Sequence, residues 1–186
     1  MNRKVVLWID HILFLIAVIV LLALSYCALA QNSQVDDPWA PFEFLIGNWS
    51  GSGSGQPGEI VAGSTSFSFK LGQNILIRNN KAEYAPKPGE KSGAVHEDLM
   101  IVYRQTGESQ FRAIYFDNEG HIINYRVTFP DKQHSVVFES DASDKAPRFR
   151  FVYEMEPDGQ LSGEFLIAPP GGEFKTYTKG KVKRTG

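Results

Sequence analysis

The chain has 186 residues, of which 42% are hydrophobic and 22% charged, and its formal net charge is -2. These values are ordinary for one soluble globular domain, and the near-neutral charge gives no broad basic field for nucleic acid. The single cysteine, Cys27, lies in the apolar N-terminal stretch, so a product cleaved after that stretch has no thiol for a disulfide, a metal site or a nucleophile.

The first 30 residues have the pattern of a secretory signal. Arg3 and Lys4 give a positive start, an unbroken apolar run extends from Ile12 to Leu24, and Ala28-Leu29-Ala30 is a small-residue cleavage pattern. The apolar run of 13 residues is shorter than the ~20 that a membrane-spanning helix needs. We therefore predict a signal helix over residues 1–30 and a periplasmic or secreted product. An uncleaved anchor, which would be the one link to a membrane, is the alternative.

After a predicted short linker over residues 31–41, the chain has the pattern of an all-β domain. No interval from Phe42 onward shows a sustained apolar period of 3.6 residues, and clusters rich in Gly or Pro interrupt the chain at short spacing. Such clusters supply the backbone conformations of chain reversals, and connections this short join antiparallel strands. Nine clusters delimit ten strands: 56–58, 71–73, 86–93, 106–108, 117–120, 130–132, 141–147, 157–159 and 169–172.

Closure of these strands into a barrel removes the two unpaired edges that an open sheet would leave. We therefore predict a single antiparallel up-and-down barrel of about ten strands over residues 42–186, with a two-sheet sandwich as the rival architecture. Alternation places Phe149, Phe151, Tyr153 and Met155 on one face of their strand. In the segment 99–102 both faces are apolar, and the alternation there leaves the inward face undecided.

The opening strand is predicted to run from Phe44 into a glycine-rich stretch that ends at Pro57, and it contains Gly-x-Trp-x-Gly-x-Gly-x-Gly from Gly47 to Gly55. Glycine at every second residue lets a strand coil sharply and lets another backbone approach it. An inward Arg184 at the end of the chain needs compensation, and the face of Trp49 can supply a cation–π contact worth about 0.5–2 kcal/mol.

The Gly-x-Trp stretch resembles the opening of nitrobindin-type barrels and of a related group of uncharacterised bacterial lipocalin-like proteins. In the wider calycin group, the tryptophan of this motif sits beside an arginine of the last strand, a position that Arg184 matches. The resemblance implies that Gly47, Trp49 and Arg184 close the barrel. Nitrobindins also imply an interior that can hold haem on a histidine near the C-terminus.

The histidines of this chain are His11, His96, His121 and His134, so the proximal haem ligand that the resemblance implies is absent. We therefore predict no cofactor, with haem as the alternative. No His-x-His, His-Glu-x-x-His or dense carboxylate array is present, so we predict no metal site either.

The cluster His96-Glu97-Asp98 is the densest group of titratable side chains, and it stands at the start of a predicted strand. In an extended strand His96 and Asp98 point the same way while Glu97 points oppositely. The pair is either a polar cluster at the barrel mouth, able to do acid–base work or hold a metal weakly, or a hydrogen-bonded strand end. We name no catalytic residue.

Aromatic residues make up 12% of the chain, and many lie on strands with apolar neighbours on the same face. Collectively they allow an apolar pocket in which an arginine such as Arg112 or Arg78 orients a polar head. We predict that the barrel binds a small hydrophobic molecule. The alternatives are a haem protein or isomerase that acts on reactive nitrogen species, and an envelope module whose barrel is filled. The predicted ligand-binding residues are Phe67, Phe69, Arg112, Tyr115, Tyr125, Phe151, Tyr153 and Phe165.

Overall fold

A computed structural model of the chain describes residues 16, 18, 19, 37–141 and 145–185. The chain divides into two compact units, Met1–Asp37 and Pro38–Gly186. The predicted signal helix and the linker up to residue 36 lie outside the described residues, apart from residues 16, 18 and 19, which are helical. Among the described residues, no helix has the length and apolar character that a membrane crossing requires.

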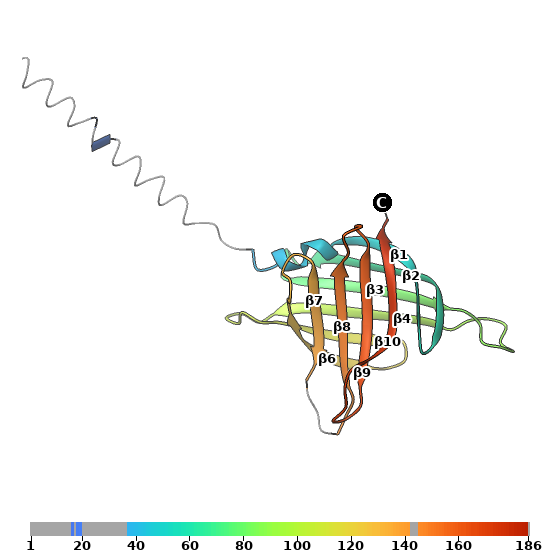
Figure 1. Cartoon of the computed structure of the whole chain (residues 1–186). Coiled ribbons are helices and arrows are strands. Elements are labelled where there is room, and N and C mark those ends of the chain that lie inside the picture. The colour runs from blue at the N-terminus through green and yellow to red at the C-terminus, as the bar shows by residue number, and fades with distance from the viewer. Residues whose placement is uncertain (1–15, 17, 20–36, 142–144, 186) are drawn as a thin grey trace, which may run out of the picture. The chain divides into compact units, whose positions relative to one another are not determined.

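Ten strands of the second unit form a closed barrel in which every neighbouring pair is antiparallel, as predicted (Figure 1). Each strand pairs with the next along the chain, and β1 pairs with β10 to complete the circle. The strands are β1 (Gly47–Gly55), β2 (Gly58–Lys70), β3 (Ile75–Tyr84), β4 (Val95–Arg104), β5 (Phe111–Asp117), β6 (Ile122–Thr128), β7 (Ser135–Ser140), β8 (Arg148–Met155), β9 (Leu161–Ala168) and β10 (Lys175–Arg184).

The first and last strands pair from Trp49 opposite Arg184 to Gly55 opposite Thr178. The repeated glycines of β1 make this pairing possible. A Cβ atom at Gly51 or Gly53 would overlap a backbone carbonyl oxygen of β10, so only glycine allows the two backbones to approach this closely. The glycine-rich stretch is therefore the seam of the barrel and not a linker.

The apolar stretch before Gly47 is a 3₁₀ helix, η1 (Ala40–Leu45), and the prediction that the first strand begins at Phe44 is wrong. Residues three apart share one face of such a helix, and Trp39, Phe42 and Leu45 are all buried. Phe42 packs edge-on against Phe111 and Phe129, with ring centroids 5.0 and 4.9 Å apart. The compact unit accordingly begins at Pro38, inside the predicted linker, and η1 fills one end of the barrel (Figure 1).

Trp49 is 1% exposed and joins η1 to the seam. Its indole Nε1 donates to the carbonyl of Leu45 at 2.7 Å, and the Cζ of Arg184 lies 4.3 Å from the centre of the indole ring. The Arg184 guanidinium also donates to the carbonyl oxygen of Ile46. Gly47, at φ +127°, has no room for a Cβ beside Arg184. Gly47, Trp49 and Arg184 thus meet as predicted, but Arg184 is exposed and covers the indole from the solvent side, so the expectation that it points inward is wrong.

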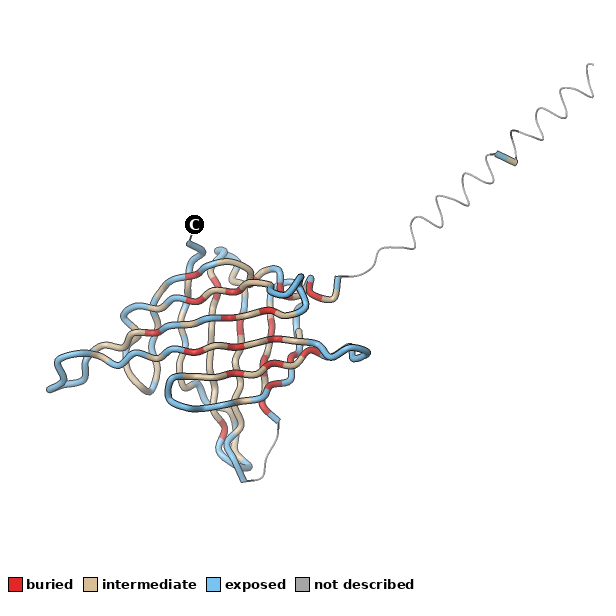
Figure 2. The backbone as a smooth tube through the Cα atoms, turned by 180° about the vertical axis from the view of Figure 1, so that it is seen from behind, coloured by how far each residue is buried: buried red, intermediate tan, exposed pale blue. Residues whose placement is uncertain are grey.

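Buried and partly exposed positions alternate along the strands (Figure 2). This alternation settles the inward face of β4, where Met100 and Val102 are buried while Leu99 and Ile101 lie on the outer face. Ile101 is opposite Ile77 of β3 and Ile114 of β5, so apolar neighbours half-bury the outer face at this point.

Candidate functional site

The barrel encloses a cavity of about 560 Å³ between the filled end and an open mouth. Exposed residues of the segment between β3 and β4, such as Lys87 and Glu90, and of the β5–β6 turn, such as Glu119 and His121, line the mouth. Two unlike walls face each other across the cavity: β3, β4 and β5 contribute polar side chains, and β8, β9 and β10 contribute mostly apolar ones.

The apolar wall is built from stacked rings. Phe149 of β8 and Phe165 of β9 stack with their planes 4° apart and their centroids at 6.1 Å. Phe151 and Tyr153 of β8 stack at 15° and 5.2 Å. Ile167 extends this wall. Because inward residues alternate along each strand, the wall is a regular consequence of Phe-x-Phe-x-Tyr in β8.

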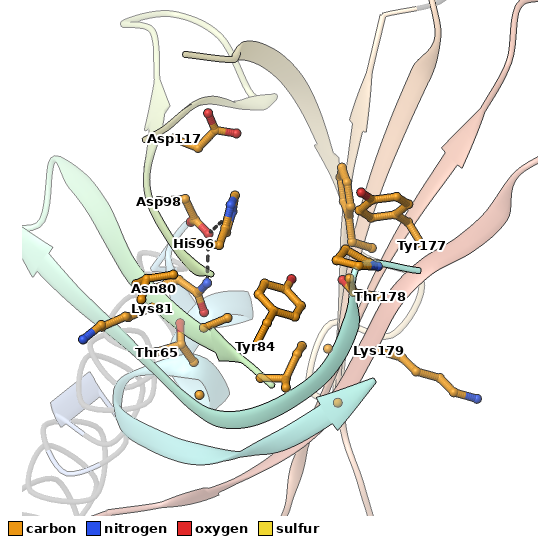
Figure 3. A pocket seen from close by; sticks show the side chains of 18 of the residues that line it. Thr65, Asn80, Lys81, Tyr84, His96, Asp98, Asp117, Tyr177, Thr178 and Lys179 are labelled. Atoms are coloured by element: carbon orange, nitrogen blue, oxygen red, sulfur yellow. Dashed lines mark hydrogen bonds and ion pairs between the residues drawn. The ribbon is translucent and has the colours of Figure 1, made fainter. Parts of the chain in front are cut away.

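The polar wall centres on a buried ion pair between β3 and β4. The Nη1 of Arg78 lies 2.7 Å from the Oδ1 of Asp98, and both side chains are 2% exposed. Asn80 Nδ2 donates to the second carboxylate oxygen at 2.9 Å, and the Nε2 of His96 lies 3.4 Å from that oxygen. Figure 3 shows Asn80 and His96 flanking Asp98 on one side of the cavity, with Tyr177 opposite them.

Arg78 also touches the apolar wall. Its Cζ lies 4.6 Å from the ring centre of Phe151 and 5.5 Å from that of Tyr153, so the guanidinium rests on aromatic faces that favour a cation. Burial is the largest effect and opposes the charge, but Asp98 together with the nearby hydroxyls of Tyr153, Tyr115 and Tyr125 outweighs it, and the pKa of Arg78 is raised above its ordinary value. Arg78 is therefore a permanent buried cation that Asp98 neutralises.

Five polar side chains form a closed ring of contacts, the mouth ring, on one side of the mouth next to this pair. The Nδ1 of His96 lies 3.1 Å from Glu119 Oε1, and its Nε2 lies 3.0 Å from the hydroxyl of Tyr115. The hydroxyl of Tyr115 donates to Asp117 Oδ2 at 3.2 Å, and that oxygen lies 2.9 Å from the Nδ1 of His121. Glu119 completes the ring at 4.0 Å from His121.

The ring has one arrangement of protons that satisfies every contact. If His96 is protonated, it donates to Glu119 and to Tyr115, which leaves the Tyr115 hydroxyl free to donate to Asp117. The hydrogen bond with Asp98 and that with Glu119 raise the pKa of His96 against the opposing effect of burial. Burial, together with Asp98, raises the pKa of Tyr115, which keeps this hydroxyl protonated.

A raised pKa for His96 makes the stability of the barrel depend on pH. Protonated His96 is bound more favourably in the folded state, so its contribution is complete below about pH 6.5, the ordinary histidine value, and is lost as the pH rises through the folded-state pKa. We expect His96→Gln to cost more unfolding free energy at about pH 5 than at about pH 9. Urea unfolding across this range measures the difference, and a cost that does not vary with pH would contradict the assignment.

The structure brings six of the sequence-predicted residues to the cavity and leaves four elsewhere. Phe67 and Tyr125 are buried in the core, and Phe69 packs against Trp39 near the filled end. Arg112 lies on the outer face, where its Nη1 is 3.7 Å from Asp141, and the expectation that it faces the interior is wrong. The reason is alternation, since its neighbours Phe111 and Ala113 take the inward positions. The six at the cavity are His96, Asp98, Tyr115, Phe151, Tyr153 and Phe165.

Sequence reasoning missed most of the polar wall. The sequence indicates Arg78 only as one of two arginines able to orient a polar head, and it does not indicate Asn80, Asp117 or Glu119 as site residues. The available signal was strand pairing, because Asn80 stands directly opposite Asp98. Predicting that register requires the geometry of the connection between β3 and β4, and this geometry cannot be inferred from a segment as long as 85–94.

The C-terminal histidine that the nitrobindin resemblance implies as the haem ligand has no counterpart in the cavity, and His96 does not replace it. Strand β10 contains no histidine, and both ring nitrogens of His96 already have polar partners. A histidine that binds iron needs one nitrogen free of such a partner. In the described ranges, no group of three or more His, Cys, Asp or Glu side chains is placed to hold a metal ion.

No protein-family model matches the chain, and no curated protein matches it. Among solved structures, the barrel is similar to that of "Crystal Structure of Rv2717c from M. tuberculosis", with a TM-score of 0.55 and 13% sequence identity over 82% of this chain and 100% of that chain. At this identity the likeness shows the fold alone, a calycin-like barrel. The narrower resemblance to nitrobindins stays a prediction.

Proposed function

We propose that this barrel binds a small, mostly apolar molecule without covalent chemistry, as a lipocalin-like carrier that works after export from the cytoplasm. The observation that carries the proposal is the cavity of about 560 Å³, which has a stacked aromatic wall and a polar wall. A cavity of this size, mostly apolar with a few placed polar groups, is typical of small-molecule sites. Export rests on the signal pattern of residues 1–30.

The apolar wall contributes affinity for the ligand, and the polar wall sets its orientation. Rings such as Phe149 and Phe165 remove apolar surface of the ligand from water, which gives affinity in proportion to the area buried. Polar groups such as Tyr115 and His96 orient the ligand through its polar end. The contacts of Arg78 and Asp98 are satisfied largely within the wall, so their charge is not exposed to the apolar ligand.

Filling the cavity should abolish binding. Ala82 is buried, lines the cavity and stands opposite Gly63, which leaves space for a larger side chain. We expect Ala82→Trp to weaken binding of the fluorescent probe N-phenyl-1-naphthylamine at least about tenfold, since the indole occupies the space of the probe.

The matched control is Glu83→Trp, which adds the same ring at the next residue on the outer face. It breaks only an ion pair with Lys81 whose side chains are both 46% exposed, and exposed pairs contribute little. Probe titrations of the two variants measure the effect. Equal affinity in the two variants would contradict binding inside the barrel.

A further inference from the structure

The charges around the cavity distinguish between possible head groups of a ligand. Inside, the cation of Arg78 is neutralised by Asp98 at 2.7 Å. Nearer the mouth lies a second buried carboxylate, Asp117, whose side chain is 4% exposed. Burial alone would raise the pKa of Asp117, but the hydrogen bonds and charge of His121, together with the backbone hydrogen bond from Glu119, outweigh burial and lower it, so Asp117 is an anion at neutral pH.

The exposed groups at the rim do not reverse this balance. Glu119 adds a third carboxylate beside His96 and His121. The rim also contains Lys81 and Lys179, but Figure 3 shows their amines directed away from the cavity. The exposed Lys87 lies beside the carboxylate of Glu90, which accepts from the Lys87 backbone N–H. A ligand carboxylate that reaches the polar wall therefore meets the carboxylates of Asp98, Asp117 and Glu119. The cations there, Arg78 and protonated His96, are already engaged with Asp98 and Glu119.

Uncharged polar groups of a ligand find hydrogen-bond donors on both walls of the cavity. The side chain of Tyr153 lines the cavity, and its hydroxyl makes no hydrogen bond to another described residue. A hydroxyl or ketone oxygen can accept from such donors without bringing a charge into the interior. The Tyr115 hydroxyl is a further donor when it turns from Asp117.

We propose that the cavity selects a flat apolar molecule with an uncharged hydrogen-bonding head, a hydroxyl or a ketone, and discriminates against the corresponding carboxylate. This inference rests on the proposed function and names its ligand class. The flat body follows from the near-parallel rings of Phe149 with Phe165 and of Phe151 with Tyr153, which present ring faces along one wall. The neutral head follows from the paired charges of Arg78 and Asp98.

Three fluorescent probes with the same flat body test the head group: 1-pyrenemethanol, 1-pyrenecarboxylic acid and 1-pyrenemethylamine. At about pH 7.5 we expect the alcohol to bind at least about tenfold more tightly than the acid, because like charges placed together in an interface repel each other and weaken binding. Tighter or equal binding of the acid would overturn this inference and leave the proposed function standing. Failure of all three probes to bind would overturn both.

Two variants separate the charge of the wall from its shape. Asp98→Asn leaves Arg78 without its counter-ion, and the acid should then gain about tenfold or more in affinity while the alcohol changes little. The circular dichroism spectrum shows whether this variant folds. Glu119→Gln, at a side chain that is 60% exposed, removes one rim charge without touching the buried pair, and the acid should gain about twofold. An acid affinity that is unchanged in the folded variants would contradict the role of these carboxylates.

Discussion

Replacing Trp49 with alanine should lower the free energy of unfolding by about 3–5 kcal/mol, the usual cost of truncating a buried aromatic side chain. The indole is 1% exposed and contacts two parts of the molecule that are far apart in sequence. It donates to Leu45 at the end of η1, and it lies under the guanidinium of Arg184 at the end of β10. Its removal therefore loosens both the filled end and the seam.

Chemical denaturation with tryptophan-independent detection, such as far-ultraviolet circular dichroism, measures this loss. The control is Ile122→Ala, at a side chain that is 66% exposed, which should change stability by less than about 0.5 kcal/mol. A loss below about 1 kcal/mol for Trp49→Ala, the size of a surface substitution, would contradict the closure that we describe.

Removing Asp98 alone should cost about 3–5 kcal/mol, because the substitution leaves the buried Arg78 without its counter-ion. Asp98→Ala is the variant. The two side chains are each 2% exposed and form an ion pair at 2.7 Å, so water replaces little of the stabilisation that Arg78 loses with its counter-ion. The measurement is the free energy of unfolding in urea.

The double variant Arg78→Met with Asp98→Ala tests the cause of that cost. Removing both charges avoids an uncompensated ion in the core, so the double variant should be more stable than Asp98→Ala alone. Arg78 also packs on the ring of Phe151, and methionine preserves much of that contact. A double variant as unstable as the sum of its single variants would mean that the two residues act independently.

The barrel was predictable because its signals are local. Clusters such as 117–120 and 157–159 contain the glycines at positive φ, Gly120 and Gly159, that reverse the chain between strands. Alternation in β8 assigns the inward face from residue types alone. The seam was predictable because the calycin resemblance implies that the Gly-x-Trp stretch lies beside an arginine of the last strand, and Trp49 stands directly opposite Arg184.

Other features depend on contacts between distant segments and could not be read from the sequence. The apolar residues before Gly47 suit a strand as well as a 3₁₀ helix, and only the filled end of the barrel selects the helix. Ile75 and Ile77 lie on the outer face of β3. Because apolar residues are expected to face inward, the sequence pattern suggests the wrong face for Arg78. The mouth ring of five polar side chains could not be predicted either, because it joins His96 of β4 to Glu119 of the β5–β6 turn, 23 residues later in the chain.

Diffraction from crystals grown with 1-pyrenemethanol tests most directly whether the interior of this barrel is a binding site. We predict density for the pyrene rings against Phe149 and Phe165, with the hydroxyl toward the wall that holds Arg78 and Tyr115. Density for the probe on the outer surface, with side chains filling the space of about 560 Å³, would contradict the account.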